Sequence, residues 1–310
     1  MQKLETDDDG SSTKKYYVNC QELLNSSGNT KDWLTNLHIL DEKYLPPDKK
    51  ARMSEKILMQ GVLEKYKEVV IKMGIVDTIE NEWKIYNQLK EHKVPGVLKY
   101  FCYFHCSDDF GKIPDQPEFI CKGPGDNLKV VLMDFGIHNL SDFPWKTTEA
   151  LQSCIKQSML TVLQAYVSFG FYHEDCHPRN FIIKQTRKSQ REYNINGSVV
   201  TVPLHGYETF MMDLEGSKSN RSVKHLYIDL YLFCNKLDGQ MVHKINSRHA
   251  DTYVSKLKSM KDNDTHQLDV PEVLNIIENV SQNIILTQPN MEGGRYRLPW
   301  RHKKKKHIRP

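Results

Sequence analysis

The alternation of apolar and polar positions predicts two regions with different secondary structure. In the first region, short runs rich in β-branched and aromatic residues predict strands at 54–63, 67–73, 97–105 and 128–135. An amphipathic pattern predicts a helix over 78–89, and residues 32–40 show a further helical pattern. We therefore expect a small, mainly antiparallel sheet that carries a helix.

From about residue 141 the pattern becomes mainly helical. Apolar periodicity predicts helices over 151–171, 226–237 and 270–285. A hairpin that turns at Asn196-Gly197 and a short strand at 210–214 interrupt them. The sequence HEDCHPRNFII, residues 173–183, places a dense polar loop between the first helix and an apolar run. Polar groups packed between apolar elements indicate a site on a rigid scaffold.

Composition places the chain among ordinary globular proteins, because 39% of its 310 residues are hydrophobic and 26% are charged. No apolar run approaches the roughly 18 residues that a membrane-spanning helix needs. The first fifteen residues are polar and acidic, unlike a signal peptide. Seven cysteines without a repeated spacing argue against a disulfide framework and against a zinc site. We expect an intracellular, cytoplasmic protein.

The net charge of +4 is concentrated at one end of the chain. The last ten residues, RHKKKKHIRP, carry six Lys or Arg, which leaves a net charge of −2 for the rest. We therefore expect residues 291–310 to form a basic tail. Such a tail can bind nucleic acid or an anionic surface, can act as a nuclear targeting signal, or can be a solvated end without a partner. One short tail without interleaved aromatic residues is a poor footprint for a nucleic-acid binder. Residues 1–30 are polar, and we expect them to be disordered.

The polar loop holds two residues suited to phosphoryl transfer. Asp175 and Asn180 stand five positions apart. A carboxylate orients the attacking hydroxyl in this chemistry, and an amide oxygen nearby helps to hold a metal. The alternative is that HED ends a helix and HPRN forms a simple turn.

Three further polar residues stand at the ends of apolar segments. Lys72 ends the strand VVIK, Glu82 lies on the helix that follows, and Asp213 closes the strand in MMDLEG. A lysine held by a glutamate can bind phosphate oxygens, and an aspartate opposite an asparagine suits Mg²⁺. In isolation, the default interpretation is an ordinary strand-end lysine for Lys72 and a solvent-facing helix charge for Glu82, and the alternative for Asp213 is a turn residue.

This ordered set resembles the protein kinase superfamily over about residues 50–240. VVIK is similar to the V-A-I-K strand, HEDCHPRN to the catalytic loop, and MDLEG to the D-F-G element, with Leu214-Glu215 replacing Phe-Gly. VVLMDFG, residues 130–136, resembles the hinge strand between lobes. Asp229 resembles the buried aspartate that braces the catalytic loop.

The resemblance implies a bilobal α+β fold, with a small antiparallel-sheet N-lobe and hinge over 31–136 and a mainly helical C-lobe over 137–290. It implies a protein serine/threonine kinase that uses ATP and Mg²⁺ and acts on a protein substrate. Lys72, held by Glu82, would contact the phosphates, and Asp175 would act as the base. Asn180 and Asp213 would bind the metal. The adenine would lie near Met133, Asp134, Phe135 and Gly136.

Several positions depart from the kinase pattern. No glycine-rich loop precedes Lys72, and LPPDKKAR (45–52) stands near its place. Glu174 replaces the arginine that normally receives an activation-loop phosphate, so we expect activity that phosphatase treatment does not abolish. Only fifteen residues, without A-P-E, separate Asp213 from Asp229, so the platform for a protein substrate is abbreviated. These departures suggest a divergent kinase similar to serine/threonine kinases of large DNA viruses.

Two alternatives remain open from the same residues. HEDCHPRN also fits the D-x-H-P-x-N loop of small-molecule kinases such as aminoglycoside and choline phosphotransferases, although those enzymes carry a larger C-terminal helical region. A pseudokinase that only binds a ligand would explain the absent glycine-rich loop and the DLE sequence. Against the pseudokinase, all five polar catalytic positions are retained.

Overall fold

The computed structural model describes residues 34–39, 57–63, 67–105, 128–134, 136, 138–219, 222–241, 245–247, 250–262 and 267–287. Several predictions lie outside these residues. They concern the polar segment 1–30, the basic stretch 45–52, the hinge residue Phe135 and the tail 291–310.

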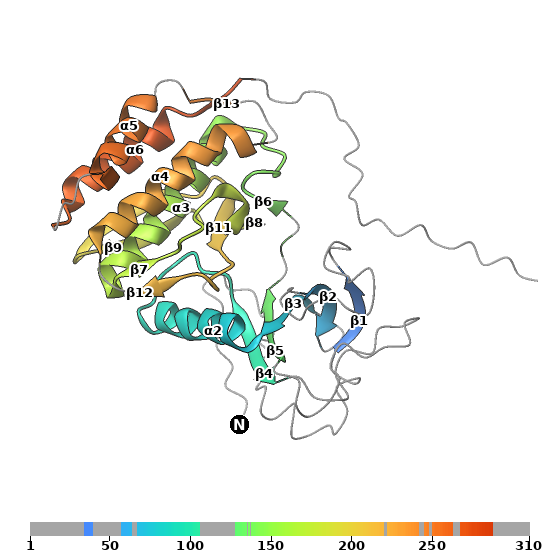
Figure 1. Ribbon diagram of the computed structural model, residues 1–310. Helices are drawn as coiled ribbons and strands as arrows, with labels where there is room; N and C mark the ends of the chain where they lie inside the picture. The colour runs from blue at the N-terminus through green and yellow to red at the C-terminus, as the bar shows by residue number, and fades with distance from the viewer. Residues whose placement is uncertain are drawn as a thin grey trace, which may run out of the picture.

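The N-terminal part is a five-stranded antiparallel sheet of strand order β1-β2-β3-β5-β4, with one helix packed against it (Figure 1). The strands are β1 (Leu34–Ile39), β2 (Ile57–Leu63), β3 (Lys67–Ile75), β4 (Tyr100–His105) and β5 (Leu128–Asp134). The helix, α2 (Val76–Glu91), follows β3 directly. The predicted antiparallel sheet with one helix is confirmed.

The helix predicted over 32–40 is wrong, because β1 occupies this segment. Its backbone pairs with β2, from Leu34 opposite Leu63 to Ile39 opposite Met59. A short apolar run fits the helical and the strand period almost equally well, and a neighbouring strand edge then decides the outcome.

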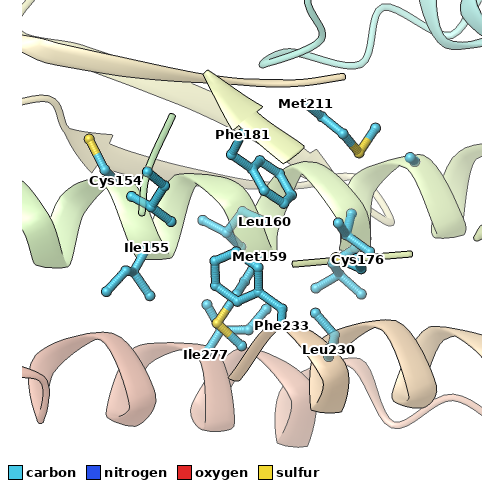
Figure 2. Close-up of a cluster of buried hydrophobic side chains, with 14 of the residues drawn as sticks. Cys154, Ile155, Met159, Leu160, Cys176, Phe181, Met211, Leu230, Phe233 and Ile277 are labelled. Carbon is cyan, nitrogen blue, oxygen red and sulfur yellow. The ribbon is translucent and has the colours of Figure 1, made fainter. Parts of the chain in front are cut away.

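The larger part is built around helix α3 (Thr148–Phe169), which is buried along most of its length. Thr147 caps its start by accepting a hydrogen bond from the Ala150 N–H at 3.2 Å, and Gly170 ends it in the left-handed conformation (φ 79°). In Figure 2, Met159 and Leu160 of this helix face Leu230 and Phe233 across the core. The other helices are α4 (Val223–Gln240), α5 (Asp251–Asp262) and α6 (Val270–Gln282).

The pattern correctly predicted α3, α4 and α6 but missed α5. Helix α5 buries only Leu257 fully, so its sequence carries little apolar periodicity. No helix in the described part of the chain is long and apolar enough to span a membrane.

Short strands place the polar segments beside one another. β8 (Phe181–Gln185) lies between β6 (His138–Asn139) and β11 (Tyr207–Met211), and the last pair of β8 and β11 joins Phe181 to Met211. The residues just before β8 and just after β11 therefore meet at one end of this sheet. The predicted hairpin is confirmed as β9 (Gln190–Ile195) and β10 (Ser198–Pro203). The remaining short elements are β7 (Phe171–Tyr172), a 3₁₀ turn (Pro178–Asn180), β12 (Lys218–Ser219), β13 (Ile245–Asn246) and β14 (Ile285–Leu286).

The segment after α2 is hydrogen-bonded to the larger part. Val97 forms a parallel bridge with Met211 of β11. The Leu98 N–H donates to the Met211 carbonyl at 2.9 Å, and the Met211 N–H donates to the Gly96 carbonyl at 2.7 Å. These bonds lock the connection between the two parts close to Asp213.

Candidate active site

A buried lysine and a buried glutamate join strand β3 to helix α2. The Nζ atom of Lys72 lies 2.7 Å from Oε2 of Glu82, and both side chains are almost completely buried. The other oxygen of Glu82 accepts hydrogen bonds from the Tyr100 hydroxyl at 2.5 Å and from the Leu214 N–H at 3.3 Å. Buried charges need a partner of opposite charge and hydrogen bonds. The two charges are paired here and Oε1 of Glu82 is hydrogen-bonded, whereas Oε2 accepts no hydrogen bond.

Lys72 also contacts the segment that follows β11. Its Nζ atom lies 2.5 Å from Oδ1 of Asp213 and 3.1 Å from Oε2 of Glu215. Burial lowers the pKa of Lys72, but the carboxylates of Glu82 and Asp213 outweigh it and raise the pKa overall, so the ammonium stays charged.

Asp213 lies two residues beyond the end of β11 rather than closing the strand. Its backbone adopts a positive φ of 61°. That conformation is strained for a residue with a side chain, and strain of this kind gathers at functional sites.

The polar loop is held as a compact turn at the start of β8. The Asn180 side-chain amide donates to the Asp175 carbonyl at 2.9 Å, and the Met212 N–H donates to the Asn180 carbonyl at 2.9 Å. The Asp175 carboxylate is largely exposed and lies 3.3 Å from Nε2 of His177. HPRN does form a turn, and the turn presents Asp175 to solvent while it ties Asn180 to the segment that leads into Asp213.

Asp229 of helix α4 braces the start of this loop from below. Its carboxylate accepts hydrogen bonds from the backbone N–H of His173 at 2.5 Å and of Glu174 at 3.1 Å. Burial raises the pKa of Asp229 to about 7, despite these two donors. Glu174 has a positive φ of 68°, so the brace holds a strained backbone.

The buried ring of His173 links the loop to the segment before Asp213. Burial lowers the pKa of His173, so the ring is neutral at pH 7. Nε2 lies 2.9 Å from the Met212 carbonyl, so this nitrogen carries the proton.

The chemistry of the oxygen donors fits Mg²⁺. Within the described residues, the carboxylate oxygens of Glu82, Asp213 and Glu215 lie within 4.8 Å of one another. The Asn180 amide nitrogen faces Asp175, which leaves its oxygen as the available ligand atom. Hard oxygen ligands of this kind suit Mg²⁺. Because Lys72 already contacts the three carboxylates, a metal would have to share them with the ammonium.

Two of the predicted adenine-binding residues, Met133 and Asp134, end strand β5. Met133 is buried, and the half-buried Asp134 forms an ion pair with Lys184 of β8. A Cβ atom on Gly136 would lie 2.0 Å from Cγ2 of Ile182, so the backbone passes too close to β8 for any other residue.

The sequence did not predict several contacts of this site. The Tyr100 hydroxyl on Glu82, the Glu215 carboxylate on Lys72 and the Lys184–Asp134 ion pair all join residues far apart in the chain. Glu174 forms an exposed ion pair of 2.6 Å with Lys218 of β12. Glu174, paired with Lys218, thus places a negative charge at the position where the kinase resemblance implies an arginine.

An antiparallel sheet with one helix, a buried lysine–glutamate pair and a hydrogen-bonded loop ahead of β8 together define a kinase-like α+β protein. No family model matches the chain. Its sequence is similar to serine/threonine-protein kinase haspin from Mus musculus, with 27% identity over 119 residues, and from Bos taurus, with 25% identity over 139 residues. These segments cover 37% and 44% of this chain but only 15% and 17% of the relatives.

Among solved structures, the chain is similar to one titled "WaaP in complex with acyl carrier protein". That likeness has a TM-score of 0.43 and 11% identity, and it covers 76% of this chain and 86% of the other. The similarity to haspin supports a kinase-like phosphotransferase.

Proposed function

We propose that this protein is a divergent serine/threonine kinase that uses ATP and Mg²⁺ to phosphorylate a hydroxyl of a protein substrate. The observation that carries the proposal is the buried contact of 2.7 Å between Lys72 and Glu82. A lysine on a strand, fixed by a glutamate on the neighbouring helix, is the arrangement that kinases use to hold ATP phosphates. The partial similarity to haspin points to the same chemistry.

The residues of the site divide the work of phosphoryl transfer. Lys72 binds phosphate oxygens with an ammonium whose position is set by Glu82. Asp175 accepts the hydrogen bond of the attacking hydroxyl and aligns it, with His177 fixing the carboxylate at 3.3 Å. Asn180 and Asp213 would hold Mg²⁺, which supplies neutralisation of the phosphate charge. Residues 133–136 would line the adenine side of the nucleotide.

The proposal extends to the setting of the enzyme. We infer an intracellular protein related to the kinases of large DNA viruses, with the basic residues 291–310 acting as a nuclear address or an anion contact. Removing residues 301–310 is expected to leave turnover intact, and lost turnover would mean that the tail belongs to the catalytic unit.

A small-molecule kinase is the second candidate, and the contact between His177 and Asp175 favours it. In the D-x-H-P-x-N pattern the histidine stands two residues after the catalytic aspartate, as it does here. The fifteen residues between Asp213 and Asp229 also leave little room for a platform that binds a peptide.

Transfer of radiolabelled phosphate from ATP tests the proposal and separates the two candidates. Purified protein would be offered generic protein substrates and a panel of small alcohols and amino sugars. Label on protein supports the kinase of proteins, and label on a small alcohol alone supports the second candidate. If neither proteins nor small alcohols are labelled in the presence of Mg²⁺, the remaining interpretation is a pseudokinase that only binds a ligand.

Two variants assign the transfer to this site. Lys72→Met is expected to lower turnover by about 10²- to 10³-fold, because phosphate oxygens lose their buried cation. Asp175→Asn is expected to lower turnover by about 10³-fold while nucleotide affinity changes little. Lys90→Met, which changes an exposed lysine of α2, is the matched control. Normal turnover in either site variant would refute the assignment.

A further inference from the structure

The surroundings of Lys72 contain one carboxylate more than its role requires. Three oxygens surround its Nζ atom, from Asp213 at 2.5 Å, from Glu82 at 2.7 Å and from Glu215 at 3.1 Å. Nζ donates a hydrogen bond to Oδ1 of Asp213, and it contacts Glu82 and Glu215 as ion pairs. A phosphate oxygen therefore has to approach an ammonium group that three carboxylates already surround within 3.1 Å.

The backbone around Glu215 is fixed to the same helix that carries Glu82. The Asn81 side-chain amide donates to the Glu215 carbonyl at 2.7 Å and to the Ser217 carbonyl at 2.9 Å. The Leu214 N–H donates to Glu82 at 3.3 Å. Helix α2 therefore holds the residues on both sides of the Glu215 side chain, and this side chain is directed at Lys72 from an anchored position.

The net charge of this cluster is negative, like that of the phosphate groups of a nucleotide. One ammonium and three carboxylates carry a formal net charge of −2, and the carboxylate side chains range from 0% exposed for Glu82 to 34% exposed for Asp213. Like charges that are shielded from water repel far more strongly than they do in solution. A triphosphate that approaches Lys72 meets this negative field first.

Of the three carboxylates, Glu215 is the one placed to leave. Glu82 is held by Tyr100 and Leu214 in addition to Lys72, and Asp213 makes the shortest contact with the ammonium. Glu215 makes the longest of the three contacts with the ammonium, at 3.1 Å.

We propose that Glu215 is a positioning residue that contacts Lys72 and competes with the phosphate groups of the nucleotide for its ammonium group. The inference rests on the proposed function, because it assumes that Lys72 receives phosphate. A divalent cation that draws Glu215 away from Lys72 relieves the competition. We therefore expect nucleotide affinity to depend more strongly on the divalent cation than it would if Asp213 and Asn180 were the only residues that respond to the cation.

Binding of trinitrophenyl-ATP, followed by its fluorescence without turnover, tests this competition. Glu215→Gln keeps the size of the side chain and removes its charge. In EDTA, this variant is expected to bind the probe about tenfold more tightly than the unaltered protein, a difference of about 1.4 kcal/mol. In saturating Mg²⁺ the difference is expected to fall below about threefold, since the cation neutralises Glu215 in the unaltered protein.

Matched variants separate this effect from net charge and from folding. Glu91→Gln removes one charge from the exposed end of α2 and is expected to leave affinity unchanged in both conditions. Glu215→Ala, which removes the carboxylate without adding an amide, is expected to shift affinity in the same direction as Glu215→Gln. Equal or weaker binding by both Glu215 variants in EDTA would overturn the inference. Failure of the unaltered, folded protein to bind the probe in Mg²⁺ would instead overturn the proposed function, and the inference with it.

Discussion

Replacing Asp229 by asparagine tests the brace beneath the catalytic loop. The carboxylate is 1% exposed and accepts the backbone N–H groups of His173 and Glu174. An asparagine resembles the protonated aspartic acid. Its oxygen still accepts one of the two hydrogen bonds, but its NH₂ group is a donor and faces the second backbone N–H group. Only the ionised aspartate satisfies both donors.

The magnitude follows from the pKa of Asp229, which burial raises to about 7. The ordinary value is 3.8, so the folded protein binds this proton more tightly than the unfolded chain does. The bound proton therefore stabilises the folded protein fully below the ordinary pKa of 3.8. This contribution to the free energy of unfolding is lost as the pH rises through about 7. Between about pH 5.5 and about pH 8 the loss amounts to about 2 kcal/mol, and asparagine does not titrate.

Urea unfolding of the unaltered protein and of Asp229→Asn, at matched pH values, measures this difference. Relative to the unaltered protein, the free energy of unfolding of Asp229→Asn is expected to increase by about 2 kcal/mol between about pH 5.5 and about pH 8. Other titrating groups are common to both chains and cancel in the comparison. Parallel curves would show that Asp229 titrates in the ordinary acidic range, and the account of its burial would then be wrong.

Two further variants probe the packing around the site. Tyr100→Phe removes the hydroxyl that donates to Glu82 at 2.5 Å and is expected to lower the free energy of unfolding by about 1.5–3 kcal/mol; an unchanged urea midpoint would contradict that bond. Gly96→Ala is expected to cost about 3 kcal/mol, because φ is 72° and the new Cβ would lie 2.5 Å from Oγ1 of Thr161. Gly197→Ala, with φ of 84° but no atom within 4 Å of its Cβ, is the control, and thermal unfolding should show a loss of only about 1 kcal/mol; equal losses would refute the steric part.

The sequence predicted the elements whose signals are local. VVIK is a β-branched run, and the amphipathic spacing from Ile79 to Leu89 defines one face of α2, so Lys72 and Glu82 could be placed on adjacent elements. The turn at Asn196-Gly197 was visible because both residues tolerate the positive φ angles of 51° and 84° found there.

The features that could not be predicted depend on partners far away in the chain. β1 is a strand because β2 offers it an edge, and nothing within 34–39 encodes that partner. Glu215 reaches Lys72 across 143 positions because Asn81 anchors its backbone, and no spacing rule links these residues. The sequence showed Glu215 as a departure from a motif, but its electrostatic role depends on tertiary contacts.

The seam between Gly96 and Met211 fixes a pivot for the smaller lobe. Two backbone hydrogen bonds attach the chain just after α2 to β11, so the end of this helix is tethered to the larger lobe. Glu82 lies nine residues before the last residue of α2, about 14 Å along the helix axis. Lys72 of β3 and Glu82 of α2 both belong to the smaller lobe, so a rotation about the tether moves the pair together relative to Asp213 and Glu215 of the larger lobe. Rotation at this seam therefore changes how closely Lys72 approaches the two carboxylates of the larger lobe while the buried pair stays intact.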